Sequence, residues 1–202
     1  MTSPALDADG RRARRDANRL AVLDAVLALF AEGETNPTPD QVAERAGLSP
    51  RSVYRYVASR EELQRAAIER QVDHLIPLLE LANIGQGPVS TRIRVLVAQR
   101  LALYRAIERT NPLAKALSLK NELVATKLRE AALVMREQTA NQFAPELSVL
   151  SPSARRLMLD ALDALTQPET FHHYLTVLGR SDEATVQSLT HIMHATLERK
   201  SQ

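Results

Sequence analysis

The 202-residue sequence contains no cysteine and no tryptophan, and aromatic residues make up only 3% of it. Without cysteine there can be no disulfide and no thiolate metal site, which is compatible with a reducing cytoplasm. The six glycines form no phosphate-binding loop, dinucleotide fingerprint or nucleophile elbow, so we expect neither an enzyme nor a cofactor. No apolar run is long enough for a signal peptide or a membrane span, so we expect a cytoplasmic protein.

The apolar residues that are present favour helices. They make up 45% of the chain and are dominated by leucine and alanine, and no segment alternates as a strand would. We therefore predict an all-α protein. The net charge of +2 is small, so basic residues matter only where they are concentrated, at residues 11–19 and 49–60.

Residues 38–63 carry the start and stop signals of three short helices. Residues 38–41 form a capping box with proline at the first helical position, and residues 59–62 form a second one. Between them, Gly47 can end a helix in the left-handed conformation, and residues 49–50 supply a serine cap followed by proline. The segment therefore predicts two helices joined by a tight turn, with a third helix close behind.

The spacing inside this segment is that of a helix-turn-helix unit. A small residue, Ala43, is followed by Gly47 and then by the β-branched Val53, which lets the two helices cross closely. If Val53 and Val57 bury the second helix, its outward side chains are Arg51, Ser52, Arg55 and Tyr56. Residues 49–60 contain three arginines, two tyrosines and no acidic residue, a composition that suits a polyanion.

Residues 18–65 resemble the DNA-binding domain of the TetR family of bacterial transcriptional regulators. The first helix of that domain is matched by Val22, Ala25, Val26, Leu29 and Phe30. The rest of the motif is matched by Thr38, Val42, Ala43, Ala46, Gly47, Leu48, Ser49, Tyr54, Tyr56, Glu62 and Leu63. The sequence departs from the motif in having Arg60 for lysine, Val57 for phenylalanine and a shorter loop at residues 33–37.

The resemblance implies which residues bind DNA. Phosphate contacts are expected from Thr38, Ser49, Tyr54, Tyr56 and Arg60. Base edges are expected to face Pro50, Arg51, Ser52 and Arg55, and either of these arginines could bond a guanine through two hydrogen bonds. The alternative is that this is an ordinary solvated helix face.

We divide the chain into a flexible basic arm at residues 1–15, a DNA-binding domain at 16–82, and a ligand-binding and dimerisation domain at 83–202. The arm holds four arginines over five positions and is either a solvated tail or a DNA contact beside the main site. Pro77 predicts a kink or an early end of the helix that begins near Ser59.

The resemblance implies that the second domain binds a small-molecule effector and forms a homodimer. Polar or pliable residues near its apolar stripes are candidates for the effector pocket: Arg100, Tyr104, Asn121, Thr126, Met135, Gln138 and Thr139. The last helices are expected to form the dimer interface, through Phe171, Tyr174, Leu175, Leu178, Val186, Leu189, Ile192, Met193 and Leu197. The protein is then a repressor released from a palindromic operator by its effector.

Two alternatives remain open. The first is a DNA-binding regulator that works without an effector. The second is a helical metal-binding protein or enzyme built on the histidines, which include the adjacent pair His172 and His173 and the pair His191 and His194 at helical spacing. The sequence identifies no third or fourth ligand for either pair, so we predict no metal site.

Overall fold

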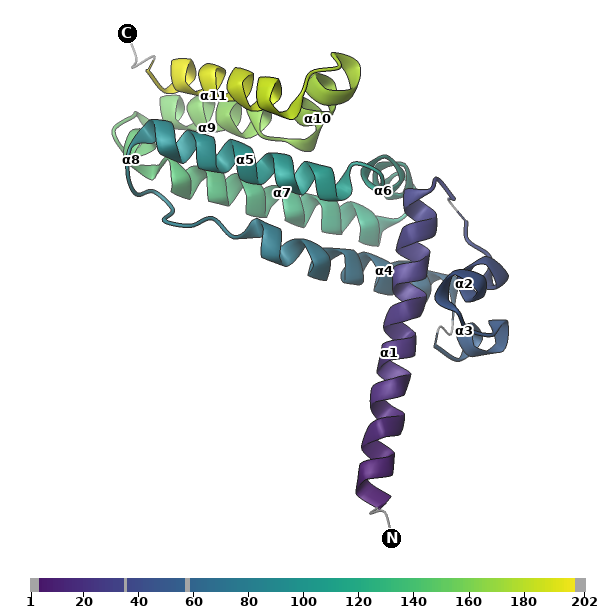
Figure 1. Ribbon diagram of the computed structural model, residues 1–202. Helices are drawn as coiled ribbons and strands as arrows, with labels where there is room; N and C mark the ends of the chain where they lie inside the picture. Colours follow the sequence, from purple (N-terminus) through teal and green to yellow (C-terminus); the bar gives the residue numbers. More distant parts are fainter. Residues whose placement is uncertain (1–3, 35, 57–58, 199–202) are drawn as a thin grey trace. The chain divides into compact units, whose positions relative to one another are not determined.

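The computed structural model describes residues 4–34, 36–56 and 59–198, apart from the side chains of residues 4–9, 60, 61, 64 and 73. In this part of the chain every regular element is a helix, which confirms the all-α prediction (Figure 1). The elements are α1 (Pro4–Ala31), α2 (Pro39–Ala46), α3 (Pro50–Tyr56), α4 (Arg60–Leu75), a 3₁₀ turn (Ile76–Leu79), α5 (Val89–Ile107), α6 (Asn111–Ser118), α7 (Glu122–Gln142), α8 (Ala144–Ser148), α9 (Pro152–Leu165), α10 (Pro168–His172), a π-helical turn (His173–Val177) and α11 (Asp182–Glu198).

The chain forms two compact units, whose limits differ from the expected boundary at residues 82 and 83. The first unit comprises Met1–His74 with Arg109–Val124, and the second comprises Leu75–Glu108 with Ala125–Gln202. Helix α4 ends at Leu75 and Pro77 lies in the 3₁₀ turn that follows, as its missing N–H and fixed φ predict. We refer to the two units as the head and the body.

The head is built on the apolar face of α1. All five residues predicted for that face, from Val22 to Phe30, are buried against Val42, Val53 and Ala67 of the next three helices. Ion pairs add to this packing at the surface. Arg70 of α4 bonds Asp24 of α1 through two nitrogens, at 2.9 and 3.2 Å. Exposed pairs of this kind contribute less than about 1 kcal/mol each.

The expectation of a flexible arm is wrong for residues 4–15, because α1 already begins at Pro4. Alanine, leucine and arginine are good helix formers, and proline is tolerated in the first turn. The helix can therefore extend toward the N-terminus beyond the apolar stripe that packs in the head. Residues 1–3 lie outside the described part of the chain.

The body packs α5, α9, α10 and α11 around one apolar core that includes Leu96, Phe143, Leu162 and Phe171. The loop before α5 is tied to this core. Arg92 donates to the carbonyl oxygens of Gly87 and Gln142, at 3.1 and 2.6 Å. No described helix is long and apolar enough to cross a membrane.

Candidate nucleic-acid interface

The turn between α2 and α3 has the geometry that its sequence predicts. Thr38 and Gln41 form the reciprocal capping box, with the Thr38 backbone N–H donating to Oε1 of Gln41 at 2.8 Å. Gly47 ends α2 in the left-handed region at φ 66°. Ser49 then caps α3, accepting a bond at its Oγ from the backbone N–H of Ser52 at 3.2 Å. These contacts fix the direction in which α3 leaves the turn.

The outward face of α3 consists of groups that can donate to phosphates and bases. Arg51, Tyr54 and Arg55 are exposed, with Tyr54 at 66%. Ser49 and Pro50 at the start of the helix are exposed as well, and Ser52 is half-buried. Thr38 is exposed, although its hydroxyl is already engaged with Gln41. The side chain of Arg60 and the whole of Val57 lie outside the described residues.

Tyr56 is not placed as predicted. We expected it to point outward, but the residue is only 9% exposed and packs in the core of the head. Its hydroxyl oxygen accepts hydrogen bonds from Nδ2 of Asn18 and from Nη2 of Arg55, at 3.2 and 3.0 Å. The bond from Asn18, followed by the bond from Arg55, lowers the pKa of Tyr56 below its usual value. The tyrosine in the last turn of α3 therefore faces α1.

Sequence reasoning missed Asn18, although its spacing could have revealed it. Asn18 lies one helical turn before Val22, so it continues the buried stripe of α1. A half-buried polar residue at the end of an apolar stripe needs a hydrogen-bond partner. The nearest polar group of α3 provides one.

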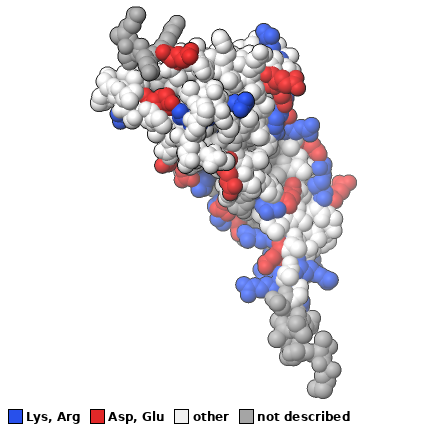
Figure 2. All heavy atoms as spheres, turned by 60° about the vertical axis from the view of Figure 1, so that its left-hand side comes forward, with Lys and Arg blue, Asp and Glu red and all other residues white. Residues whose placement is uncertain are grey.

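Basic side chains gather on the stretch of α1 that precedes this stripe. Arg12, Arg14, Arg15 and Arg19 are all exposed, as is Arg11. On the face drawn in Figure 2, blue side chains cluster beside the undescribed residues at the end of this helix. This stretch carries a local positive potential that the small net charge of the whole chain does not reveal.

The comparisons with known proteins agree with this arrangement. The chain is 32% identical over 103 residues to the HTH-type transcriptional repressor LfrR of Mycolicibacterium smegmatis, and 28% identical over 116 residues to the HTH-type transcriptional regulator TcmR of Streptomyces glaucescens. These matches cover 51% and 50% of this chain, and the chain spans only about half the length of either relative, 52% and 51%. No protein-family model matches the chain.

Solved structures share the fold. A TetR-family transcriptional regulator from Streptomyces coelicolor superposes with a TM-score of 0.69 at 19% identity, over 90% of this chain and 80% of that one. The chain therefore has the fold of TetR-family transcriptional regulators. A second Streptomyces coelicolor structure, of the protein SCO7518, superposes with a TM-score of 0.60 at 20% identity, over 87% of this chain and 98% of that one.

In the body, four of the seven predicted pocket residues lie together. Arg100 is 2% exposed and donates to Oε1 of Gln138 at 2.9 Å and to the carbonyl oxygen of Met135 at 2.8 Å. Thr139 donates to the same carbonyl at 3.0 Å. No described residue bonds Nε of Arg100. Burial lowers the pKa of Arg100 to about 10, against the opposing charge of Asp163, so the guanidinium stays protonated at neutral pH.

The other three predicted pocket residues lie elsewhere. The buried Tyr104 stacks on Phe171 at 6.2 Å, and its hydroxyl lies 3.3 Å from Nδ1 of His172. Asn121 belongs to the head, where its Oδ1 accepts hydrogen bonds from the backbone N–H groups of Leu123 and Val124 at 3.0 and 3.3 Å. Thr126 is half-buried on α7. The seven residues therefore do not form one site.

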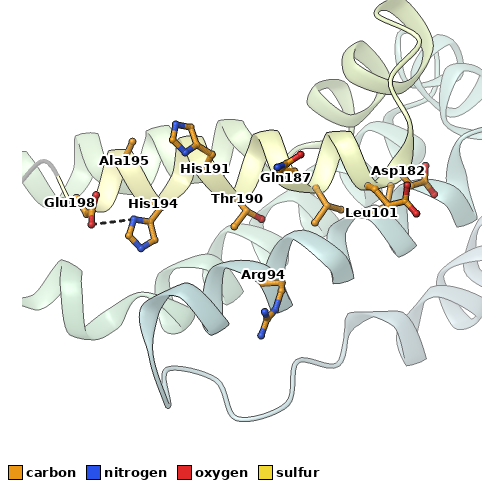
Figure 3. Close-up of a pocket in the computed structure, with 11 residues that line it drawn as sticks. Arg94, Leu101, Asp182, Gln187, Thr190, His191, His194, Ala195 and Glu198 are labelled. Carbon is orange, nitrogen blue, oxygen red and sulfur yellow. Dashed lines mark ion pairs between the residues drawn. The ribbon is translucent and has the colours of Figure 1, made fainter.

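A groove between α5 and α11 was not predicted. Its volume is about 710 Å³, and Arg94 and Leu101 line it from α5. Figure 3 shows Thr190 and His194 on its α11 side, with His194 paired to Glu198 at 3.3 Å. The volume falls in the range of small-molecule sites. None of the seven predicted pocket residues is among those that line the groove.

The predicted dimer residues divide into two groups. Phe171, Leu189 and Met193 have no exposed surface, and Leu197 is 9% exposed, because all four pack in the core of their own chain. For these four the predicted interface role is wrong. The remaining five residues keep accessible surface: Tyr174, Leu175, Leu178, Val186 and Ile192.

The histidine pairs do not assemble a metal site in the described part of the chain, where no three His, Cys, Asp or Glu side chains are placed to hold an ion. His172 bonds Tyr104, and His173 contacts the ring of Tyr174 edge-on at 6.2 Å. His191 and His194 line the groove.

Proposed function

We propose that this protein is a sequence-specific DNA-binding repressor that acts in the cytoplasm. The observation that carries the proposal is the outward face of α3, where Arg51, Tyr54 and Arg55 stand on a helix fixed by caps at both ends of the turn. The relative LfrR is named a transcriptional repressor and TcmR a transcriptional regulator, which supports the same role.

In this proposal the side chains of the head divide into two sets. Thr38, Ser49, Tyr54 and Arg60 bind phosphates and fix the register of α3 on the duplex. The second set contacts the base edges and consists of Pro50, Arg51, Ser52 and Arg55. One of its arginines donates hydrogen bonds to O6 and N7 of a guanine. Tyr56 leaves the phosphate set, because its ring is buried and its hydroxyl is engaged within the head.

The exposed arginines on the first turns of α1 add phosphate contacts beside the main site. A helix that carries Arg12, Arg14 and Arg15 presents them in a fixed array, rather than as a chain that follows the minor groove. Each phosphate neutralised in this way makes binding more sensitive to salt.

We further propose that the protein is a homodimer on a palindromic operator. One helix-turn-helix unit covers a half-site, and two units related by a twofold axis meet half-sites about 34 Å apart. The partly exposed residues Leu178, Val186 and Ile192 of the last helices, with Tyr174 and Leu175, supply apolar surface for a second copy.

A small-molecule effector then releases the repressor. The cluster of Arg100, Met135, Gln138 and Thr139 supplies polar groups inside an apolar body, which suits a site that orients a ligand. An effector shifts the DNA-binding equilibrium only by its different affinities for the bound and released states. A body that binds no ligand would leave a DNA-binding regulator without an effector.

Selection from a genomic-fragment library with the purified protein, at about 150 mM salt, tests the proposal. We expect one enriched palindrome with half-sites about one helical turn apart. Weak binding that ignores sequence and falls steeply with salt would contradict it. The genes beside the enriched site would then guide a search for the effector.

A further inference from the structure

The hydroxyl of Tyr56 is the meeting point of side chains from α1 and α3. It accepts hydrogen bonds from Asn18 at 3.2 Å and from Arg55 at 3.0 Å. The guanidinium carbon of Arg55 also lies 5.3 Å from the centroid of the Tyr56 ring. The ring is held in the core of the head, so it is a rigid support for a side chain that is itself exposed.

This contact restricts Arg55 before any DNA is bound. A long arginine side chain normally loses much rotamer freedom when it is ordered at an interface, and that loss weakens binding. The ring and the hydroxyl of Tyr56 already hold the guanidinium from one side. A guanidinium has five N–H donors, of which Tyr56 takes one. The other donors remain for a paired contact with a guanine.

Arg51, on the same exposed face, is different. Among the described residues it makes no hydrogen bond or ion pair, and no ring lies against it. Its side chain must be ordered when DNA arrives. The two arginines that could contact a base therefore differ in how far their side chains are ordered before DNA binds.

We propose that Tyr56 is a positioning residue that orients Arg55 for base recognition, and that Asn18 holds the Tyr56 hydroxyl in place for this task. The inference rests on the proposed DNA-binding function and assigns sequence discrimination chiefly to Arg55. It also explains why a tyrosine with a buried ring ends α3, because a phenylalanine would fill the same space without engaging either partner.

The test compares the variants Tyr56→Phe and Tyr54→Phe in the full chain. For each, the affinity for the operator selected by wild type is divided by the affinity for a scrambled duplex of the same length. Tyr56→Phe keeps the ring and should lower this ratio roughly threefold to tenfold, the range expected for one lost hydrogen bond. The salt dependence of DNA affinity should be the same for Tyr56→Phe as for wild type, because no phosphate contact is removed. Tyr54→Phe removes a proposed phosphate contact, so it should weaken binding to both duplexes alike and leave the ratio unchanged.

A cycle with Arg55→Ala separates positioning from a merely structural role. In the Arg55→Ala background the Tyr56 hydroxyl has no arginine to orient. Tyr56→Phe should therefore not lower the affinity ratio further. An equal loss in both backgrounds would overturn the inference, and so would a higher ratio in the single variant, which would mean that the contact withholds Arg55 from DNA.

The outcomes also separate this inference from the function on which it rests. A wild-type protein that selects no sequence would overturn the proposed function and the inference with it. A wild-type protein that selects an operator, with Tyr56→Phe discriminating just as well, would overturn only the role assigned to Tyr56.

Discussion

Arg92 of α5 and Glu146 of α8 form a two-pronged ion pair in the body, with one of its hydrogen bonds at 2.8 Å and the Arg92 side chain 5% exposed. Burial, the largest single influence, would by itself raise the pKa of Glu146. The hydrogen bonds from Arg92, a backbone hydrogen bond and the charge of Arg92 together outweigh burial and lower the pKa. A carboxyl group whose pKa is lowered on folding stabilises the fold above its unfolded pKa and loses that contribution as the pH falls through its folded value.

Glu146→Gln should therefore destabilise the body at pH 7 and have little effect in acid. We expect a loss of about 1–3 kcal/mol at pH 7, the range for hydrogen bonds to a charged group. The difference from wild type should close only below about pH 4, since the unfolded pKa of glutamate is about 4.3. Urea unfolding at several pH values measures this. Glu130→Gln, which breaks an exposed pair with Lys127, is the control and should cost under about 1 kcal/mol.

Gly47→Ala should weaken the head through its backbone alone. Gly47 has φ 66°, and nothing lies within 4 Å of an added Cβ, so the cost is that of the left-handed conformation, about 1–2 kcal/mol. Gly10→Ala is the matched control, because Gly10 lies inside α1 and also has open space around it. There alanine should stabilise the helix by up to about 1 kcal/mol. Thermal unfolding of both variants measures these changes in stability. Equal changes for the two variants would contradict the left-handed conformation assigned to Gly47.

Arg55→Ala should lose sequence discrimination, whereas Arg60→Ala should weaken binding to all DNA alike. The loss for Arg55→Ala is expected to be about 1–3 kcal/mol on the selected operator and much smaller on a scrambled duplex. Competition binding with both duplexes measures the two effects. If both variants bind like wild type, the placement of α3 on DNA is wrong.

Replacing Arg12, Arg14 and Arg15 together by glutamine should flatten the salt dependence of DNA binding. The slope of log affinity against log salt falls by about 0.9 for each phosphate contact removed. Glutamine is a good helix former, so α1 should persist, which circular dichroism can check. An unchanged slope with intact helicity would show that this stretch of α1 stays in solvent.

Leu178→Glu should prevent formation of the proposed dimer and leave monomers. Leu178 is 49% exposed, and a charge there would be buried without a partner in the proposed interface. Leu119→Glu changes a leucine of the head that directly follows α6 and is 85% exposed, and it should leave the proposed dimer intact. Sedimentation of both variants gives the answer, and two dimers would place the interface elsewhere.

The local structure of the head could be predicted from its sequence. The capping box at Thr38, the stop at Gly47 and the apolar face of α1 are set by interactions within a few residues, so they can be read from spacing alone. The early end of α4 near Pro77 has the same origin.

The direction in which side chains face at the contacts between helices could not be predicted in this way, because it depends on tertiary packing. The sequence pattern is compatible with Tyr56 on either face of the short helix α3. Tyr56 faces inward because Asn18, 38 residues earlier, provides a hydrogen-bond partner for its hydroxyl. Phe171, Leu189 and Met193 suit a core and an interface equally well by composition, and the packing of α5 against α11 makes them core. Hydrophobic burial has no direction of its own, so the partner that covers an apolar side chain is fixed only when distant helices meet.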